Sequence, residues 1–332
     1  MTMLGIGIPV YNDQESIGKA IDCILSQTFQ DFEIHIYDNC SNDNTIKIAQ
    51  EYASKDKRIF VHQNTINIGM ASNFNRCIAL KNYKNYKYIS IKSANDLLDS
   101  TYYEKCINFL EENKDFCLCY SEGTNTASGA QPIYSYEQDD IYERIKEIIS
   151  TQGVGNMNYG VLRTNIIDKI VPIKHIQGFD HIFFLNLAML GKLKKLDEVL
   201  YDREPPVNRT EEGYRISCCS TISQRIIAIP HFVDLILGYI EFCNECFLNG
   251  LDRKQIIEMV IDISLQERYD IIAKHYSNLK NMIKVQNNLD DNDLIVLKES
   301  FHKLRHYLLK NKKFASKHTK DKFQDWMYQL NI

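Results

Sequence analysis

The chain has 332 residues, 44% of them hydrophobic and 25% charged, which is typical of a globular protein of about two domains and excludes a disordered or collagen-like chain. Its 39 basic and 43 acidic side chains give a net charge of −4, so no overall positive field favours nucleic acid as a partner. No basic region precedes an apolar stretch at the N-terminus, and no apolar run approaches the ~18 residues that span a bilayer, so we expect a soluble, cytoplasmic protein. The ten cysteines are then expected to be reduced thiols, and their spacing lacks the two-pair pattern of a zinc site.

Residues 1–120 alternate between short apolar strands and amphipathic helices. Strands are predicted at residues 4–10, 32–37, 59–62, 88–91 and 116–120, and helices at 17–25, 44–55, 71–80 and 101–113. Asn12 and Glu15 have the spacing of a capping box at the start of the first helix. The alternation of apolar strands with helices predicts a mostly parallel central sheet covered by helices on both faces.

Helical patterns dominate the rest of the chain. Helices are predicted at residues 139–150 and 179–190, and only helical patterns follow residue 220. Pro205-Pro206 marks the expected boundary between an α/β domain, residues 1–205, and a helical C-terminal region, residues 206–332. Within that region, Lys303 to Lys322 carries eight basic residues and one Asp, which is typical either of a solvated helix face or of a helix that lies on an anionic membrane. A homodimer interface built from these helices also stays open.

Four of the predicted strands end in polar clusters. These are Asn12-Asp13, Asp38-Asn39, Asn64 to Asn67, and Asn95-Asp96. Asn and Asp are common turn residues, so one such cluster would need no functional explanation. Four clusters at the carboxyl edge of one parallel sheet, where ligands bind in open α/β sheets, predict a binding cleft.

Motifs of other nucleotide-binding and hydrolytic classes do not occur in the sequence. No G-x-G-x-x-G turn follows the first strand, because Gly5 and Gly7 lie inside it, and no G-x-x-x-x-G-K-[ST] loop is present. No G-x-S-x-G elbow is present either, which argues against a serine hydrolase. The cleft is therefore expected to bind its ligand without a dinucleotide fingerprint or a P-loop.

Six stretches, in matching order and spacing, resemble the family 2 glycosyltransferases. They are Gly7–Asn12, Leu25–Thr28, Asp31–Ile34 followed by Tyr37–Thr45, Asn67–Gly69, Asn73–Arg76 and Ser93–Leu98. The resemblance extends over residues 3–205 and is strongest before residue 110. It implies the GT-A fold, a nucleotide-binding α/β sheet, and inverting transfer of a sugar from a nucleoside diphosphate sugar, for which UDP is the expected nucleotide.

The resemblance also implies which residues hold the nucleotide sugar. The expected contacts are Pro9, Tyr11 and Asn12 in the first loop, Asp38 at the nucleobase, and Asn73, Asn75 and Arg76 near the base and diphosphate. A carboxylate at Asp38 suits the N3–H of uracil because it offers only hydrogen-bond acceptors. Arg76 suits a phosphate through bidentate hydrogen bonds, although a surface arginine of a helix is the alternative interpretation.

The turn Ser93-Ala94-Asn95-Asp96 matches the donor- and metal-binding turn of the family but departs from its acidic pattern. Members usually have Asp-x-Asp or Asp-Asp here, whereas Ser93 and Asn95 replace carboxylates in this sequence. The resemblance implies Ala94, Asn95 and Asp96 as donor contacts, and Asn95 and Asp96 as ligands of a weakly held Mn²⁺ or Mg²⁺, since these hard cations prefer carboxylate oxygens. Metal independence and loss of activity are the alternatives.

The resemblance places the catalytic base at the start of the helix that follows Gly178. Asp180 is the candidate base, because inverting transfer needs a group that takes the proton of the attacking hydroxyl; capping of the helix is its alternative role. His181 is a candidate second contact or base. Two arginines are candidates to stabilise the departing diphosphate, Arg203 and Arg209. Arg203 follows a Tyr-Asp pair that resembles the family's closing strand. The alternative is that both are surface arginines.

Together these residues predict a metal-assisted glycosyltransferase that acts on a bacterial surface glycan or a lipid-linked acceptor. A peripheral contact with the inner face of the membrane fits that class of acceptor. The alternative is a non-catalytic relative that binds a nucleotide sugar or a glycan, which the altered Asn95 favours. A nucleotidyltransferase is the third hypothesis, and the first strand lacks the Gly-rich basic loop that is usual in that class.

Overall fold

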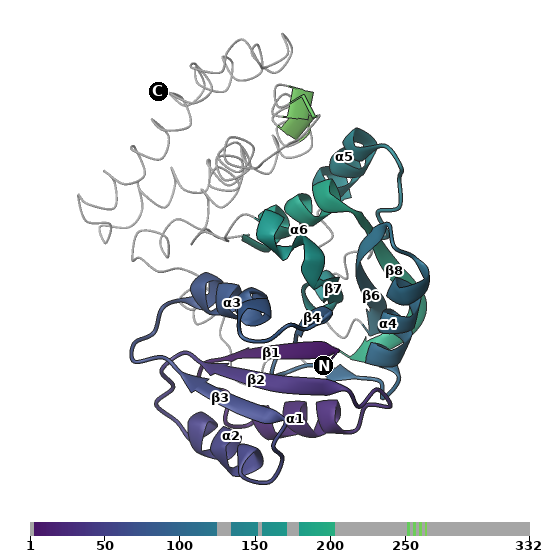
Figure 1. The fold of residues 1–332 in the computed structure, drawn as a ribbon. Helices are drawn as coiled ribbons and strands as arrows, with labels where there is room; N and C mark the ends of the chain where they lie inside the picture. Colours follow the sequence, from purple (N-terminus) through teal and green to yellow (C-terminus); the bar gives the residue numbers. More distant parts are fainter. Residues whose placement is uncertain are drawn as a thin grey trace, which may run out of the picture.

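The computed structural model describes residues 3–124, 134–151, 155–170 and 179–202, together with residues 251–252, 255–256, 259–260 and 263. Eight strands in this part of the chain form one sheet in the order β3-β2-β1-β4-β7-β6-β8-β5, flanked by helices (Figure 1). The predicted α/β class is therefore confirmed. The boundary at residue 205 and nearly all of the helical region 206–332 lie outside the described residues, so both stay predictions.

The N-terminal half of the sheet is parallel, as predicted. Its strands are β1 (Leu4–Val10), β2 (Phe32–Asp38), β3 (Ile59–Gln63) and β4 (Tyr88–Ile91). β1 pairs with both β2 and β4, in a register that places Val10 beside Asp38 and Gly7 beside Ile91. Because parallel strands share one direction, the loops that follow β1, β2 and β4 meet at one edge of the sheet.

Helices cover both faces of the sheet. They are α1 (Ile17–Leu25), α2 (Thr45–Ala53), α3 (Met70–Ile78), α4 (Tyr102–Glu112), α5 (Ile141–Thr151) and α6 (Phe179–Leu190), with short 3₁₀ helices η1 (Ala79–Asn82), η2 (Gly155–Tyr159) and η3 (Thr164–Lys169). Residues of α1, α2 and α4 pack into one core, and residues of α3, α5 and α6 pack into a second. Two cores on opposite faces explain why the strands are apolar on both sides. None of the described helices is both long and apolar enough to cross a membrane.

The C-terminal half of the sheet is mixed, and three of its four strands were not predicted from patterning. It contains β5 (Leu97–Leu98), β6 (Phe116–Thr124), β7 (Val161–Arg163) and β8 (Lys192–Asp202). β7 is antiparallel to both β4 and β6, while β8 is parallel to β6 and antiparallel to β5. Patterning predicted only β6 of these four, because β5 and β7 are too short to show a periodicity and β8 carries charged residues along most of its length.

The neighbours of the β1 backbone explain why the strand contains Gly7 and tolerates Pro9. A Cβ atom added at Gly7 would lie 2.7 Å from the Cβ of Cys77, so α3 packs directly on the strand and a larger residue would push it away. The Gly7 carbonyl accepts a hydrogen bond from the backbone N–H of Lys92, on the side of the strand that faces β4. Pro9 faces the same side, but it lies beyond Gly7, the last residue of β1 that pairs with β4. The missing N–H of Pro9 therefore costs no hydrogen bond of the sheet.

The predicted capping box at Asn12 and Glu15 is wrong. α1 begins at Ile17, its N-cap is Ser16, and no side chain caps it. Asn12 instead has a left-handed backbone with a φ of 55°, a conformation that Asn tolerates better than most residues. Asn12, which matched the spacing of a capping box, contacts the loop after β2 instead of capping α1.

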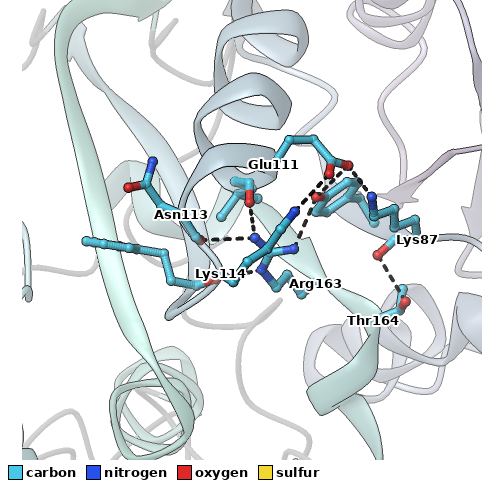
Figure 2. Close-up of polar contacts among 9 residues, drawn as sticks. Lys87, Glu111, Asn113, Lys114, Arg163 and Thr164 are labelled. Atoms are coloured by element: carbon cyan, nitrogen blue, oxygen red, sulfur yellow. Dashed lines mark hydrogen bonds and ion pairs between the residues drawn. The ribbon is translucent and has the colours of Figure 1, made fainter.

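Arg163, at the end of β7, joins three elements through buried hydrogen bonds (Figure 2). Its Nε donates to the Phe116 carbonyl at 2.7 Å, and its Nη1 donates to the Tyr88 hydroxyl at 3.1 Å. Its Nη2 donates to the Asn113 carbonyl at 3.1 Å and to the Leu110 carbonyl. One guanidinium thus satisfies carbonyl groups at the C-terminal end of α4, which helix geometry leaves without partners.

The carboxylate of Glu111 completes this cluster on the outer side of α4. It accepts hydrogen bonds from the Tyr88 hydroxyl at 3.0 Å, from Lys114 at 3.0 Å and from Lys87 (Figure 2). The hydrogen bond from Lys87 is the main reason that the pKa of Glu111 falls to about 2, so this carboxylate is ionised at neutral pH. Arg163 is the buried member of the cluster and Glu111 the more exposed one.

We expect Arg163→Met to lower the free energy of unfolding by about 2–4 kcal/mol, because several buried carbonyl groups lose their donor while the apolar volume is kept. Urea denaturation followed by circular dichroism measures this change. Lys114→Met, at an exposed residue of the same cluster, is the matched control and should change stability by less than about 0.5 kcal/mol. Equal stabilities of the two variants would show that the Arg163 hydrogen bonds contribute nothing net.

Candidate functional site

Side-chain hydrogen bonds tie the loop after β1 to the loop after β2. The Asn12 N–H donates to the Ser41 hydroxyl oxygen at 2.9 Å, and Asn12 Oδ1 accepts a hydrogen bond from the Asn42 N–H at 3.0 Å. Tyr11 is exposed and Pro9 is half-buried. The predicted first nucleotide loop is thus held firmly at Asn12 and open to solvent at Tyr11.

Asp43 holds the same two loops from the other end. Its carboxylate accepts hydrogen bonds from the Thr45 N–H at 2.9 Å and from the Gln14 N–H at 3.2 Å. Burial acts to raise the pKa of Asp43, but the hydrogen bonds from Thr45 and Gln14 outweigh it and the pKa is lowered. Asp43 is therefore ionised at neutral pH, and its hydrogen bonds hold the two loops together.

Asp38 is the last residue of β2 and is fully buried at the edge where the strands end. Its Oδ2 accepts a hydrogen bond from the Ser41 N–H at 3.1 Å, while its Oδ1 has no hydrogen-bond partner in the described structure. A buried acceptor without a donor costs about 1–3 kcal/mol of folding free energy, which a ligand N–H would recover. Asp38 therefore keeps one buried acceptor without a donor at this edge, and its contact with a nucleobase stays a prediction.

A network of asparagine side chains, which the sequence analysis did not assign, joins this edge to the loop after β3. Asn39 Oδ1 accepts hydrogen bonds from Asn64 Nδ2 at 3.0 Å and from the Ile68 N–H at 2.9 Å. Asn39 Nδ2 donates to Asn67 Oδ1 at 2.9 Å. The only signal for this network in the sequence is the clustering of Asn at strand ends. Its effect is to fix the residue that follows Asp38.

α3 carries three of the predicted donor contacts, in different environments. Asn73 is buried and its Nδ2 donates to the Tyr37 carbonyl at 2.8 Å, so it supports the end of β2. The guanidinium carbon of Arg76 lies 4.7 Å from the centre of the Tyr37 ring, and Arg76 also donates to Asn64 Oδ1. Asn75 is half-buried. The structure brings Asn73 and Arg76 to the end of β2, and contact of all three with a donor stays a prediction.

The turn after β4 is held from two sides. The Ser16 hydroxyl donates to Asn95 Oδ1 at 2.8 Å, which anchors the turn to the start of α1. Asp96 is buried, and its Oδ2 accepts a hydrogen bond from the Tyr201 hydroxyl at the end of β8. Burial first, and then the neighbouring Tyr159 and the Asp96 carboxylate, raise the pKa of Tyr201 well above its ordinary value. The Tyr201 hydroxyl therefore keeps its proton and remains a donor to Asp96.

Lys92, directly before this turn, is a site residue that the sequence analysis missed. Its side chain is fully buried, and its ammonium donates hydrogen bonds to the carbonyl groups of Ser93, at 2.8 Å, and Asp96. A buried ammonium is costly unless it is hydrogen-bonded or paired, so these contacts hold Lys92 and the turn together. Ala94 is buried within the same turn. No pattern in the sequence distinguishes Lys92 from a surface lysine.

The turn offers ligands for a hard cation, but few of them. The Asp96 carboxylate and the Asn95 side-chain carbonyl are oxygen donors of the kind that Mg²⁺ and Mn²⁺ prefer. Asn95 Oδ1 and Asp96 Oδ2 already accept hydrogen bonds, and no three His, Cys, Asp or Glu side chains gather as a metal site in the described part of the chain. These residues therefore fit a divalent ion as part of a shell that the diphosphate oxygens of a nucleotide complete.

Asp180 lies in the first turn of α6, with polar groups at both carboxylate oxygens. Its Oδ1 accepts a hydrogen bond from the His181 N–H at 3.2 Å, and its Oδ2 accepts one from Asn158 Nδ2, in η2, at 3.4 Å. The next residue of η2, Tyr159, stacks on Tyr201 with ring centres 5.3 Å apart. η2 thus connects Asp180 to the end of β8 and, through it, to the turn after β4.

Several predicted residues cannot be placed. Gly178, Arg203 and Arg209 lie outside the described residues, and so does the basic stretch Lys303 to Lys322. Their predicted roles at the diphosphate, at a membrane or in a homodimer therefore stay predictions.

Comparison with known proteins identifies the domain to which this edge belongs. Residues 6–161 match the family model described as Glycosyl transferase family 2. This segment is a family 2 glycosyltransferase domain. The match includes Asp38, Asp96 and Asn158 and ends before Asp180, so the assignment of Asp180 depends on its place in the structure.

Relatives and solved structures agree with the family. Chondroitin synthase of Escherichia coli is 25% identical over 202 residues, which are 60% of this chain and 29% of that protein. The crystal structure of S. aureus TarS 1–349 in complex with UDP-GlcNAc has a TM-score of 0.60 at 17% identity, covering 80% of this chain and 74% of that one. The mannosyltransferase PcManGT from Pyrobaculum calidifontis, in complex with GDP-Man and Mn²⁺, has a TM-score of 0.51 at 13% identity, covering 93% and 86%. The predicted GT-A fold of the glycosyltransferase domain is confirmed.

The matches cover only part of most of these relatives. The chain spans less than half the length of the first curated relatives that it matches. Likeness to them therefore describes the glycosyltransferase domain and leaves the activity of the whole chain to direct test.

We expect Asp38→Ala to weaken UDP binding by about 1–3 kcal/mol, because the variant removes an acceptor whose hydrogen bond to a ligand is charge-assisted. Isothermal titration calorimetry with UDP measures this loss. Asp31→Ala, at an exposed residue just before the opposite end of β2, is the control and should bind UDP like the wild type. An unchanged UDP affinity in folded Asp38→Ala protein would remove Asp38 from the nucleobase site.

Proposed function

We propose that the glycosyltransferase domain transfers a sugar from a UDP-linked donor to a hydroxyl group of a cell-surface glycan, with inversion at the anomeric carbon. The observation that carries this proposal is the unpaired, buried Oδ1 of Asp38 at the edge where β1, β2 and β4 end. An acceptor-only group selects a base with a ring N–H, which uracil has and cytosine lacks. The solved complex of TarS with UDP-GlcNAc supports the choice of UDP.

The remaining donor contacts are proposed from their position around Asp38. Tyr11 is exposed and follows Val10, the residue that pairs with Asp38, and Arg76 stacks on Tyr37 and keeps guanidinium donors that suit a phosphate. Asn12 sets the path of the loop that faces them. Because Asp38 is fully buried, a nucleotide reaches its Oδ1 only when a group that covers it moves aside.

We further propose that Mn²⁺ or Mg²⁺ binds together with the donor at Asn95 and Asp96. GT-A glycosyltransferases generally use a divalent ion, and the PcManGT complex contains Mn²⁺. When bound, the ion supplies positive charge that stabilises the departing diphosphate. One carboxylate and one neutral amide oxygen hold it weakly alone, so the phosphates of the nucleotide set the affinity. Lys92 keeps the turn in place for both ligands.

Asp180 is the proposed general base. The oxygen of the acceptor hydroxyl forms a bond to the anomeric carbon, and the bond from that carbon to the diphosphate oxygen breaks, with its electron pair leaving on UDP. The hydroxyl proton passes to Asp180, which loses it later to solvent. Attack on the face opposite the diphosphate inverts the anomeric carbon. A well-placed base typically contributes a factor of ~10²–10⁴ to such a step.

The class of acceptor is proposed from the relatives. A chondroitin synthase among them supports a polysaccharide as the acceptor, and a lipid-linked glycan at the inner face of the membrane is the second candidate. The competing hypothesis is a non-catalytic relative that binds a nucleotide sugar without turnover. The observation in its favour is Asn95, a neutral residue where the family usually has a carboxylate.

A thermal-shift panel of UDP-, GDP-, CMP- and dTDP-sugars, with and without Mn²⁺, tests the donor. We expect the largest stabilisation with UDP-sugars and Mn²⁺ together, because a ligand that binds only the folded state raises its stability. An assay of UDP release from the same donors separates a transferase from a non-catalytic binder. Stabilisation by GDP-sugars alone would contradict the UDP assignment.

We expect Asp180→Asn to lower turnover by about two orders of magnitude or more while the donor affinity stays nearly constant, because Asn keeps the shape and cannot take the proton. Steady-state kinetics and calorimetry with UDP measure the two quantities. If turnover survives in this variant, the role of base passes to another group, and His181→Asn is the next variant to test.

We expect Asn95→Asp to tighten Mn²⁺ binding to the nucleotide-free protein, because it adds a second carboxylate to the turn. Asp96→Ala should weaken the binding of both Mn²⁺ and UDP. Electron paramagnetic resonance of free Mn²⁺ measures the affinities in the presence and absence of UDP. Tight Mn²⁺ binding to the nucleotide-free wild-type protein would contradict the weak site, and full transfer in the presence of a chelator would show that the metal is dispensable.

A further inference from the structure

Asn158 is a polar residue beside Asp180 that the mechanism above does not use. Its Nδ2 donates to Asp180 Oδ2 at 3.4 Å. Its own Oδ1 is buried and has no hydrogen-bond partner among the described residues. The amide is therefore satisfied on the side that faces the base and unsatisfied on the other. A buried carbonyl oxygen in this state carries a desolvation penalty that a hydroxyl donor would relieve.

The fold holds Asn158 in place through its neighbours in η2. A Cβ atom added at Gly160 would lie 2.9 Å from the Cys119 carbonyl, so the chain after η2 packs directly on β6. The Tyr159 carbonyl accepts hydrogen bonds from the Tyr102 hydroxyl at 3.0 Å and from the Ser90 hydroxyl at 3.3 Å. Asn158 thus projects from a support that is fixed to β4, α4 and β6.

We propose that Asn158 positions the carboxylate of Asp180 through Nδ2 and binds a second hydroxyl group of the acceptor sugar through Oδ1. The inference rests on the proposed function, in which Asp180 takes the proton of the attacking hydroxyl. A sugar acceptor carries neighbouring hydroxyl groups on adjacent ring carbons, so one of them donates to Asp180 while the next donates to Asn158. The expected ligand is a pyranose with a vicinal pair of hydroxyl groups.

Two substitutions separate the two contacts. Asn158→Ala removes both, and we expect it to raise the KM for the acceptor and lower kcat by roughly tenfold or more, since a displaced reacting group loses rate steeply. Asn158→Asp keeps the shape and places a second carboxylate against Asp180. We expect the acid limb of its kcat–pH profile to move to higher pH, because like charges at close range disfavour a second ionised group. UDP affinity should stay within twofold of the wild type in both variants.

The assay is UDP release from UDP-GlcNAc and UDP-glucose, with water alone and with p-nitrophenyl hexosides as acceptors, over a range of pH. Asn165→Ala, at an exposed residue of η3, is the matched control and should behave like the wild type. If Asn158→Ala fails to fold by circular dichroism, the pH profile of the isosteric Asn158→Asp carries the test. Asp180→Asn is measured alongside them.

The inference is overturned if Asp180→Asn is inactive while both Asn158 variants keep the acceptor KM, kcat and pH profile of the Asn165→Ala control. That result would leave the proposed function intact. A fully active Asp180→Asn, or a wild-type protein that releases no UDP from either donor under any condition, would contradict the proposed function itself and the role of Asn158 with it. A shifted pH profile in Asn158→Asp with unchanged UDP affinity supports the inference.

Discussion

The direct packing of α3 on the backbone of β1 is the contact on which the arrangement of the site depends. A Cβ atom at Gly7 would lie only 2.7 Å from the Cβ of Cys77, so the helix and the strand approach as closely as a glycine allows. At this separation Asn73 reaches the Tyr37 carbonyl at 2.8 Å and Arg76 lies over the Tyr37 ring. A side chain at Gly7 would move the helix outward and break both contacts, because packed interiors have no spare volume.

The polar groups of the site divide into those that the protein satisfies and those that it leaves without a hydrogen-bond partner. The loops and the turn after β4 are organised by internal hydrogen bonds, in which Lys92 and Asn95 take part. Asp38 Oδ1 and Asn158 Oδ1, in contrast, are buried without a partner in the described structure. The proposed roles of Asp38 and Asn158 fit this division, because a preorganised site fixes its supporting groups and leaves the groups that recognise the substrate unpaired.

The strongest predictions from the sequence were those that depend on local pattern. The four parallel strands and the helices between them followed from apolar periodicity, and the polar clusters at their ends followed from the rule for open sheets. The capping box failed because a spacing of three residues does not say whether Asn12 turns back to its own helix or across to Ser41. β7 was missed because three residues show no period.

By itself, the sequence determined the parallel half of the sheet and the residue types at its edge, because burial of each strand is a local property of its side chains. Only the tertiary structure decided which of those groups meet. Asp96 and Tyr201 are 105 residues apart in the chain, and Ser16 and Asn95 are 79 apart, yet each pair shares a hydrogen bond. Likewise, nothing in the pattern around Lys92 indicates that it is buried. Contacts across such separations depend on the path of the whole chain, and periodicity reports only which face of an element is covered.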